Sequence, residues 1–385
     1  MKKILTPLSY VLVAVAATVV TLAMTMPGEE TRSIPSKLDQ LSQLIQNCFI
    51  EEPDVAAMED AAAAAMVDAL GDRWSYYMNA EEFVAYQEQM NNSYVGIGIT
   101  VTQAEDGYIN VMKVEAGSPA LEAGMKPGDV IVAVEGQDIG GMSLETVKIR
   151  IRGEEGTSVN LTVRREEENL EMTVTRRRIE TVVASGKMLQ DNIGLVQITN
   201  FDDRCASETI AIIEDLLEQG AQSLIFDVRY NPGGYKHELV KLLDYLLPEG
   251  PLFRSVNYAG KESVDQSDAK YLDIPMAVLI NGDSYSAAEF FAAALEEYDA
   301  AVTVGEPTTG KGYFQSAYML SDGSAAVISV GKYTTPNGVS LADVGLTPEI
   351  LVEVDDELYQ QLYYGNVEAA EDPQIQAAVE ALKAG

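Results

Sequence analysis

The stretch "IPMAVLINGDSYSAAEFFAAALEEY", residues 274–298, joins an apolar run to an alanine-rich run through the turn Asn-Gly-Asp-Ser. The apolar run has the length and composition of a buried strand, and the alanine-rich run those of a helix. Ser286 stands where the helix should begin, and Ser286-Ala-Ala-Glu289 has the form of a capping box. The pattern predicts a strand–turn–helix unit, and by itself it requires no further role for Ser284 or Ser286.

The flanking chain repeats this unit from about Thr175 onward. Further strands are expected at residues 193–201, 223–235 and 301–308, and further helices at residues 207–220 and 237–247. Alternating strands and helices predict a largely parallel sheet with helices on its faces. Functional groups in such sheets collect at the carboxyl ends of the strands. Both "NPGG" (231–234) and "GDSYS" (282–286) fall at such ends.

Composition limits the classes of function. The chain has 385 residues, of which 47% are hydrophobic, so two or three folded domains are expected. Its formal net charge of −34 argues against a nucleic-acid partner and against anionic lipid bound through a basic face. The only histidine, His237, is expected on the surface of a helix. Cys48 and Cys205 lack metal-ligand spacing. We therefore expect no metal and no cofactor, while pairing of the two cysteines stays open.

Residues 1–30 have the form of an export signal. Lys2 and Lys3 precede an apolar run from Leu8 to Met24, and no small-x-small cleavage site follows it. An uncleaved signal anchor is therefore favoured over a cleaved signal. The rest of the chain is expected outside the cytoplasmic membrane, attached to it by this segment or secreted if the segment is cut.

Residues 36–92 are predicted to form a helical arm. "SKLDQLSQLIQNCFI" (36–50) places its apolar residues on one helical face, and helices are also expected near 58–70 and 79–90. Packing alone would explain these helices, but short arms outside a catalytic core often make dimers, so a homodimer is one candidate assembly. The acidic segment 355–385 is also predicted to be helical.

Residues 93–167 change in character to alternating strands, the first of them expected at residues 94–103, with two short helices. The segments "GIGI" (96–99), "GSPALEAGMKPGD" (117–129) and "IRGEEGT" (151–157) occur in the order typical of a PDZ domain, in the permuted form found in bacterial proteases. This α+β region therefore resembles a peptide-binding module. Its glycines would expose backbone N–H groups to a terminal carboxylate, while a strand edge pairs with an extended peptide.

The PDZ resemblance assigns roles to individual residues. The carboxylate-binding loop would comprise Gly96, Ile97, Gly98 and Ile99, and the apolar wall of the groove Leu144, Val147 and Ile151. Arg152 follows the helix that carries this wall. It is either a solvated charge at the helix end or a sensor that pairs with a carboxylate in one state of the domain only.

Lys311 stands between two glycines just before an expected strand, and Gln315 lies four residues further on, on the same side of that strand. Together with "VRYNPGG", "NGDSYSAAEF" and "KYTTPNGVSL", these residues resemble the carboxyl-terminal processing proteases, also called tail-specific proteases. The resemblance covers nearly the whole chain after the anchor and places the protease core at 175–354. It implies that Ser286, not Ser284, is the nucleophile, with Lys311 as base and Gln315 as its support.

Three residues depart from the family pattern. Tyr285 stands where alanine is usual, Ala288 where serine is usual, and Tyr230 where asparagine is usual before "NPGG". None of them replaces a member of the catalytic set, although Tyr285 could narrow the site.

A serine–lysine pair can cleave peptides if the lysine is neutral. Serine needs a base, and an ordinary lysine, with a pKa near ~10.4, is charged at neutral pH. Burial must therefore lower the pKa of Lys311. The amide of Ala287 at the helix start, with that of Gly233 or Gly234, would hold the oxyanion.

The sequence thus predicts a serine endopeptidase that cleaves extracytoplasmic proteins and recognises free, apolar C-terminal tails through its PDZ domain. Two alternatives are a catalytically silent PDZ adaptor on a degenerate protease core, and a structural surface protein built around the helical arm. The complete set of Ser286, Lys311 and Gln315 argues against the first, and the glycine-rich strand ends argue against the second.

Overall fold

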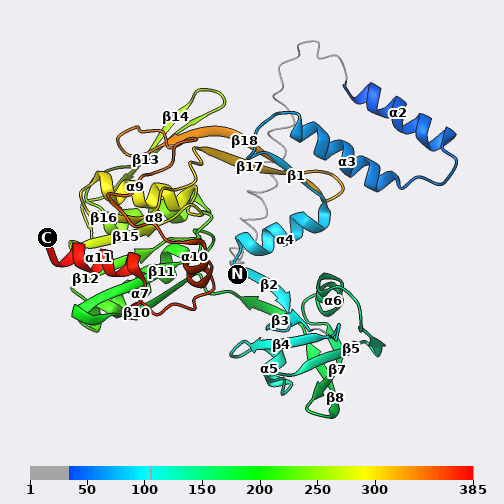
Figure 1. The fold of residues 1–385 in the computed structure, drawn as a ribbon. Helices are drawn as coiled ribbons and strands as arrows, with labels where there is room; N and C mark the ends of the chain where they lie inside the picture. Colours follow the sequence, from blue (N-terminus) through cyan, green and yellow to red (C-terminus); the bar gives the residue numbers. More distant parts are fainter. Residues whose placement is uncertain (1–33, 105, 385) are drawn as a thin grey trace, which may run out of the picture. The chain divides into compact units, whose positions relative to one another are not determined.

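The computed structural model describes residues 34–104 and 106–384 (Figure 1). It divides into two compact units, with the boundary between Ala63 and Ala64. The anchor predicted at residues 1–30 lies outside the described residues. No helix in the described part of the chain is long and apolar enough to cross a membrane.

The first unit contains helix α2 (Ile34–Cys48) and the beginning of α3 (Val55–Asp68). The α2 helix has the apolar face that its sequence predicts, but this face is not covered within the unit. Leu41 and Leu44 are 51% and 59% exposed, and Ile50, just after the helix, is 93% exposed. The unit therefore presents an apolar surface to its surroundings.

The second unit begins with the rest of α3, strand β1 (Tyr76–Met78) and helix α4 (Ala80–Met90). Asn79 caps α4, because its side chain accepts the Glu82 N–H at 2.9 Å while the Glu82 carboxylate accepts the Asn79 N–H at 2.9 Å. Strand β1 was not expected. It pairs with β18 (Ala325–Thr334), so this segment belongs to the antiparallel sheet of the protease core.

The PDZ region is a sheet in the order β3-β4-β5-β7-β8, with the short strand β6 beside β5. Its elements are β3 (Ile99–Gln103), β4 (Ile109–Val114), α5 (Pro119–Glu122), β5 (Val130–Val134), β6 (Gln137–Asp138), α6 (Leu144–Ile151), β7 (Ser158–Arg165) and β8 (Glu168–Thr175). The predicted boundary at residue 167 falls before β8, which continues the same sheet. Strand β3 lies at one edge, so the sheet can accept a further strand there.

The single strand expected at residues 94–103 is in fact two strands. Strand β2 (Ser93–Gly96) pairs with β9 (Arg177–Glu180), and β3 starts only at Ile99. The break lies at Gly98, whose φ of +77° is in the left-handed region that favours glycine. Ser118 also packs against this glycine, since a Cβ built on Gly98 would lie 2.3 Å from the Ser118 Cβ.

The protease core contains a six-stranded sheet in the order β10-β11-β12-β15-β16-β19. Its strands are β10 (Ala184–Met188), β11 (Ile193–Ile198), β12 (Ser223–Asp227), β15 (Met276–Ile280), β16 (Ala301–Gly305) and β19 (Ile350–Leu351), with the 3-10 turn η1 (Gln190–Asn192) before β11. Only β10 runs antiparallel to its neighbour. The predicted fold class, with a largely parallel sheet, is confirmed.

Helices cover both faces of this sheet (Figure 1). On β12, Leu224 and Phe226 face the core formed with α7 (Cys205–Glu218), α8 (Lys236–Leu246) and α9 (Ala287–Glu297). Ile225 faces the opposite core, which includes α11 (Pro373–Ala384). Adjacent strand residues point to opposite faces, so strands buried on both faces are apolar throughout.

The C-terminal segment is helical as predicted, with α10 (Asp356–Tyr363) before α11, and it fixes the end of β12. Arg229 follows that strand and is paired with Asp227 at 2.6 Å and with Asp372 at 2.8 Å. Gln374 accepts a further Arg229 hydrogen bond at 2.8 Å. All four side chains are buried. This network anchors the strand that leads into "NPGG" to the start of α11.

A second, antiparallel sheet was not predicted. It contains β1, β13 (Gly250–Asn257), β14 (Glu262–Ser267), β17 (Tyr313–Met319) and β18, in the order β1-β18-β13-β14 with β17 beside β18. Strands β17 and β18 carry Gln315 and Tyr333 to the carboxyl ends of the parallel strands, where Ser286 lies.

Candidate active site

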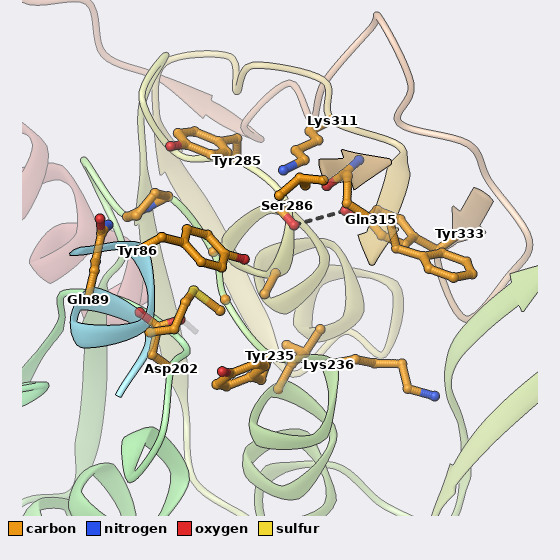
Figure 2. A pocket seen from close by; sticks show the side chains of 18 of the residues that line it. Tyr86, Gln89, Asp202, Tyr235, Lys236, Tyr285, Ser286, Lys311, Gln315 and Tyr333 are labelled. Carbon is orange, nitrogen blue, oxygen red and sulfur yellow. Dashed lines mark hydrogen bonds between the residues drawn. The ribbon is translucent and has the colours of Figure 1, made fainter. Parts of the chain in front are cut away.

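Ser286 lies at the turn between β15 and α9, as predicted, and begins the helix. Its φ of +57° and ψ of −124° are unusual for a serine, and such strain at a turn is typical of functional sites. Its N–H donates to Glu289 Oε2 at 2.8 Å. Its Oγ is hydrogen-bonded to the hydroxyl of Tyr333 at 2.8 Å (Figure 2). The hydroxyl therefore faces the pocket.

Ser284 has a structural position. Its side chain is fully buried, donates to the Val228 carbonyl at 2.8 Å, and accepts the Asn281 N–H at 3.1 Å. The first bond holds the turn to the residue that follows β12, and the second closes the turn itself. Of the two serines that the sequence offered, only Ser286 lines the pocket.

Glu289 connects the serine to the lysine through its buried carboxylate. Oε2 accepts the N–H groups of Ser286 at 2.8 Å and of Lys311 at 2.9 Å. Oε1 accepts the Gly310 N–H at 2.7 Å and the Thr308 hydroxyl at 2.5 Å. Burial raises the pKa of Glu289, although these hydrogen bonds oppose the rise. The capping-box pattern signalled this residue, but its link to the Lys311 loop could not be seen in the sequence.

Lys311 has the lowered pKa that a base in this position requires. Burial lowers the pKa of its amine to about 8, against the opposing charges of Glu289 and Asp72. The amine lies 4.8 Å from the ring centroid of Trp74 and 5.8 Å from that of Tyr285. Figure 2 shows the Lys311 side chain extending toward Ser286. Two aromatic rings thus keep water away from the amine.

Gln315 lies on β17 beside the lysine, next to an irregularity in the pairing of β17 with β18. Its Nε2 donates to the Tyr313 carbonyl and to the Ser329 hydroxyl, each at 3.1 Å. Within the described part of the chain, no donor occupies its side-chain oxygen. That oxygen is therefore available to accept a hydrogen bond.

The predicted oxyanion donors lie beside Ser286. A Cβ built on Gly233 would lie 2.7 Å from the Ser286 Cβ, and φ at this glycine is +88°, so only glycine fits. The Gly233 N–H donates to Asn231 Oδ1 at 2.8 Å. The N–H groups of Ala287 and Gly234 have no acceptor among the described residues. Of the two glycines, Gly234 therefore has the free amide.

One pocket of about 460 Å³ brings the predicted catalytic set together. It is lined by Ser286, Ala287, Lys311, Gln315, Gly233 and Gly234, among others. Tyr333 also lines it, and no pattern in the sequence signals its contact with Ser286. No cluster of side chains suited to a metal ion occurs in the described ranges. The pocket therefore combines a hydroxyl, an amine with a lowered pKa, and free amides at a helix start.

The predicted peptide-binding residues lie in the PDZ region. Ile97 is 2% exposed and packs in the core of this region, as do Val147 and Ile151, while Leu144 is partly buried against it. Gly96 ends β2 and Ile99 begins the free edge strand β3. Of the three residues expected to form the wall of the peptide groove, Leu144 is thus the one whose side chain is partly accessible.

Arg152 ends helix α6 and is about half exposed. Its Nη1 lies 3.2 Å from Glu88 Oε2, and its guanidinium lies 5.5 Å from the ring centroid of Tyr94. The pairing with a carboxylate fits the expected chemistry, but a role as sensor stays a prediction.

The three departures from the family pattern also have definite surroundings. Tyr285 packs near Trp74, with ring centroids 6.2 Å apart, and Ala288 is fully buried in α9. Tyr230 has a φ of +60° and packs edge-on against Tyr359 at 5.0 Å. His237 is exposed on α8, as predicted. The two cysteines, whose pairing the sequence left open, are free thiols.

Comparisons with known proteins identify the family of this chain. Residues 192–352 match the model of peptidase family S41, and residues 111–165 match a PDZ domain. The chain is 33% identical over 362 residues to the carboxy-terminal processing protease CtpA of Bacillus subtilis (strain 168), covering 91% of this chain and 77% of that protein. It is 30% identical over 327 residues to CtpB of the same organism, covering 83% and 68%.

One solved structure, with a TM-score above 0.5, has the same fold. An S41 protease from Bacteroides fragilis NCTC 9343 aligns with a TM-score of 0.52 at 16% identity, over 93% of this chain and 99% of that chain. The photosystem II D1 C-terminal processing protease is 25% identical, with a TM-score of 0.48, over 81% of this chain and 86% of that chain.

Fold and sequence together define a serine peptidase with a PDZ domain. The chain belongs to peptidase family S41 and, within it, to the carboxy-terminal processing proteases. The family predicted from the motifs is confirmed.

Proposed function

We propose that this protein is an endopeptidase in which Ser286 and Lys311 form a catalytic dyad, and that it cleaves extracytoplasmic proteins chosen by their C-terminal tails. The observation that carries the dyad is the position of Lys311, whose amine has a pKa of about 8 and extends toward Ser286 in a single pocket. Such an amine is substantially neutral near pH 8 and can accept the proton of a serine.

In the acylation step, neutral Lys311 takes the proton of Ser286 as Oγ attacks the scissile carbonyl carbon. The electron pair of the C=O bond moves to the oxygen, which the amides of Ala287 and Gly234 hold. The Lys311 ammonium then protonates the leaving amine, so the peptide bond breaks and an ester to Ser286 remains. Lys311 next takes a proton from a water molecule as the water oxygen attacks the ester carbonyl carbon. The ester C–O bond to Ser286 then breaks, the acid leaves, and the Lys311 ammonium returns its proton to Ser286 Oγ.

Gln315 and Tyr333 support these steps as positioning residues. The free oxygen of Gln315 can accept from the Lys311 amine and direct its lone pair toward Ser286. Burial raises the pKa of Tyr333 well above its usual range, so its hydroxyl stays protonated at neutral pH. It can then donate its proton to Ser286 Oγ in a hydrogen bond. The serine hydroxyl proton is then free to point at the Lys311 amine.

Two further proposals rest on other parts of the chain. The apolar run at residues 8–24 supports attachment to the membrane and an extracytoplasmic position. The exposed apolar face of α2 supports a homodimer, because a surface of this kind is stabilised by a partner.

Tail recognition is tested by amidating the C-terminus of a good peptide substrate. The free edge of β3 and the loop at Gly96–Ile99 support binding of a terminal carboxylate. Amidation removes the negative charge, so cleavage at the same internal bond should slow by about tenfold or more. Mass spectrometry of the products gives both rates and the cleaved bond. Equal rates for the two peptides would rule out this form of tail selection.

A further inference from the structure

Asp202 is a buried carboxyl group without a partner. Asp202 is only 3% exposed, and it lines the pocket that contains Ser286. Its Oδ1 is inaccessible to solvent and has no hydrogen-bond partner, and no cation in the described part of the chain pairs with the residue. Buried carboxylates are usually paired or hydrogen-bonded. This carboxyl group, by contrast, has no partner in the described part of the chain.

Three polar side chains surround the same end of the pocket. Tyr86, Gln89 and Tyr235 line it, and no hydrogen bond of their side chains occurs among the described residues. Burial raises the pKa of both tyrosines, and the negative charge of Asp202 adds to this rise. Figure 2 shows this group at the end of the pocket away from Lys311. These four polar side chains line one pocket and are free to bind a substrate group.

The neighbouring lysine does not neutralise Asp202. The Lys236 side chain also lines the pocket, but it points away from Asp202 in Figure 2, and its amine pairs with Asp265 at 2.9 Å. Burial, together with the charge of Asp203, raises the pKa of Asp202 to about 7. Without a cation, the ionised carboxylate is thus disfavoured.

The subsite adjoins the position of the scissile bond. A Cβ built on Gly234 would lie 2.6 Å from Asp202 Oδ1, so the carboxyl packs against the glycine whose amide is free. A substrate side chain that reaches Asp202 therefore belongs to a residue at or near the cleaved bond.

We propose that Asp202, with Tyr86, Gln89 and Tyr235, forms a subsite for a lysine or arginine side chain of the substrate. This inference rests on the proposed function, because the subsite shares the pocket of Ser286. An apolar side chain would leave the carboxyl unpaired, and an acidic one would be repelled. A cation satisfies the carboxylate directly, and the net charge of −34 attracts cationic peptides in general.

The test compares peptides that differ only by an amine. A set of peptides carries one lysine at successive positions around the cleaved bond, and a matched set carries norleucine there, which lacks the amine. At one position, wild-type kcat/KM should favour lysine by about 10- to 100-fold. Asp202→Asn should bring this ratio close to one. Asp203→Asn, a change at the adjacent exposed residue, should leave the ratio within about twofold.

Binding measured without cleavage separates this inference from the proposed function. Ser286→Ala should bind the favoured lysine peptide more tightly than the norleucine peptide by a similar factor, and Ser286→Ala/Asp202→Asn should not. If wild-type cleaves neither peptide, the proposed function fails while the binding comparison still tests the subsite. If wild-type cleaves both equally well at every position, or if Asp202→Asn keeps the preference, the subsite is overturned. Both wild-type measurements remain decisive even if Asp202→Asn does not fold.

Discussion

Replacing Ser286 with alanine, or Lys311 with methionine, is expected to lower kcat/KM for peptide cleavage by at least about 10⁴-fold. Each change removes one member of a pair that acts as a unit, so the double variant should be little worse than either single variant. Methionine fills the space beside Trp74 and Tyr285 without an amine, so the pocket should remain folded. The rates are measured with one peptide, and circular dichroism checks the fold.

Ser284→Ala is the matched control. It removes a buried hydroxyl that bonds to Val228 and Asn281, so a loss of about 1 kcal/mol in stability is expected, with cleavage retained. If Ser286→Ala were active and Ser284→Ala inactive in a folded protein, the nucleophile would be Ser284.

Glu289→Ala should have the second largest effect, because it disturbs both stability and catalysis. It leaves the N–H groups of Ser286, Gly310 and Lys311 buried without their acceptor. Each unsatisfied buried group costs roughly 1–3 kcal/mol, so the free energy of unfolding should fall by at least about 3 kcal/mol. Activity should fall further than the folded fraction explains, because the strained turn at Ser286 and the Lys311 loop lose their common anchor.

Two variants separate the hydrogen bonds of Glu289 from its volume. Glu289→Gln keeps the size but replaces one oxygen by a donor that faces other donors, so it should be impaired as well. Glu296→Ala, on the same helix, is the control. It removes the acceptor of the Thr303 hydroxyl and should leave kcat/KM unchanged. Denaturant unfolding and peptide kinetics measure both effects. A fully active, stable Glu289→Gln would show that the carboxylate does not organise the site.

The parts of the fold that were predictable are those encoded by local patterns. Alternating strands and helices indicated the parallel sheet, and strand ends with glycine and serine indicated where Ser286 would lie. The second sheet was missed because β13, β14, β17 and β18 are half-exposed hairpin strands, whose pairing depends on partners distant in sequence. Gly98 interrupts the strand expected at residues 94–103. Its positive φ goes with the packing of Ser118 against it, which an alternating sequence pattern does not reveal.

The candidate site was predictable to the same extent. Ser286, Lys311 and Gln315 could be found from their motifs, since each stands in a distinctive glycine- or serine-rich context. Trp74 and Tyr333 could not be found in this way. Trp74, just before β1, contacts the Lys311 amine, and Tyr333 on β18 contacts Ser286, both by packing between residues distant in sequence. Asp202 was missed because a carboxylate in an acidic chain has no sequence signal until its burial is known.

The central claim is that Lys311 is a neutral base near pH 8, and the only tryptophan of the chain can report on it directly. Trp74 lies 4.8 Å from the Lys311 amine, so loss of the positive charge should change its fluorescence. In the Ser286→Ala protein, fluorescence followed from pH 6 to pH 10 should show a single transition near pH 8. That transition should be absent when Lys311 is also methionine. No transition below pH 10, or one that persists without Lys311, would contradict the account.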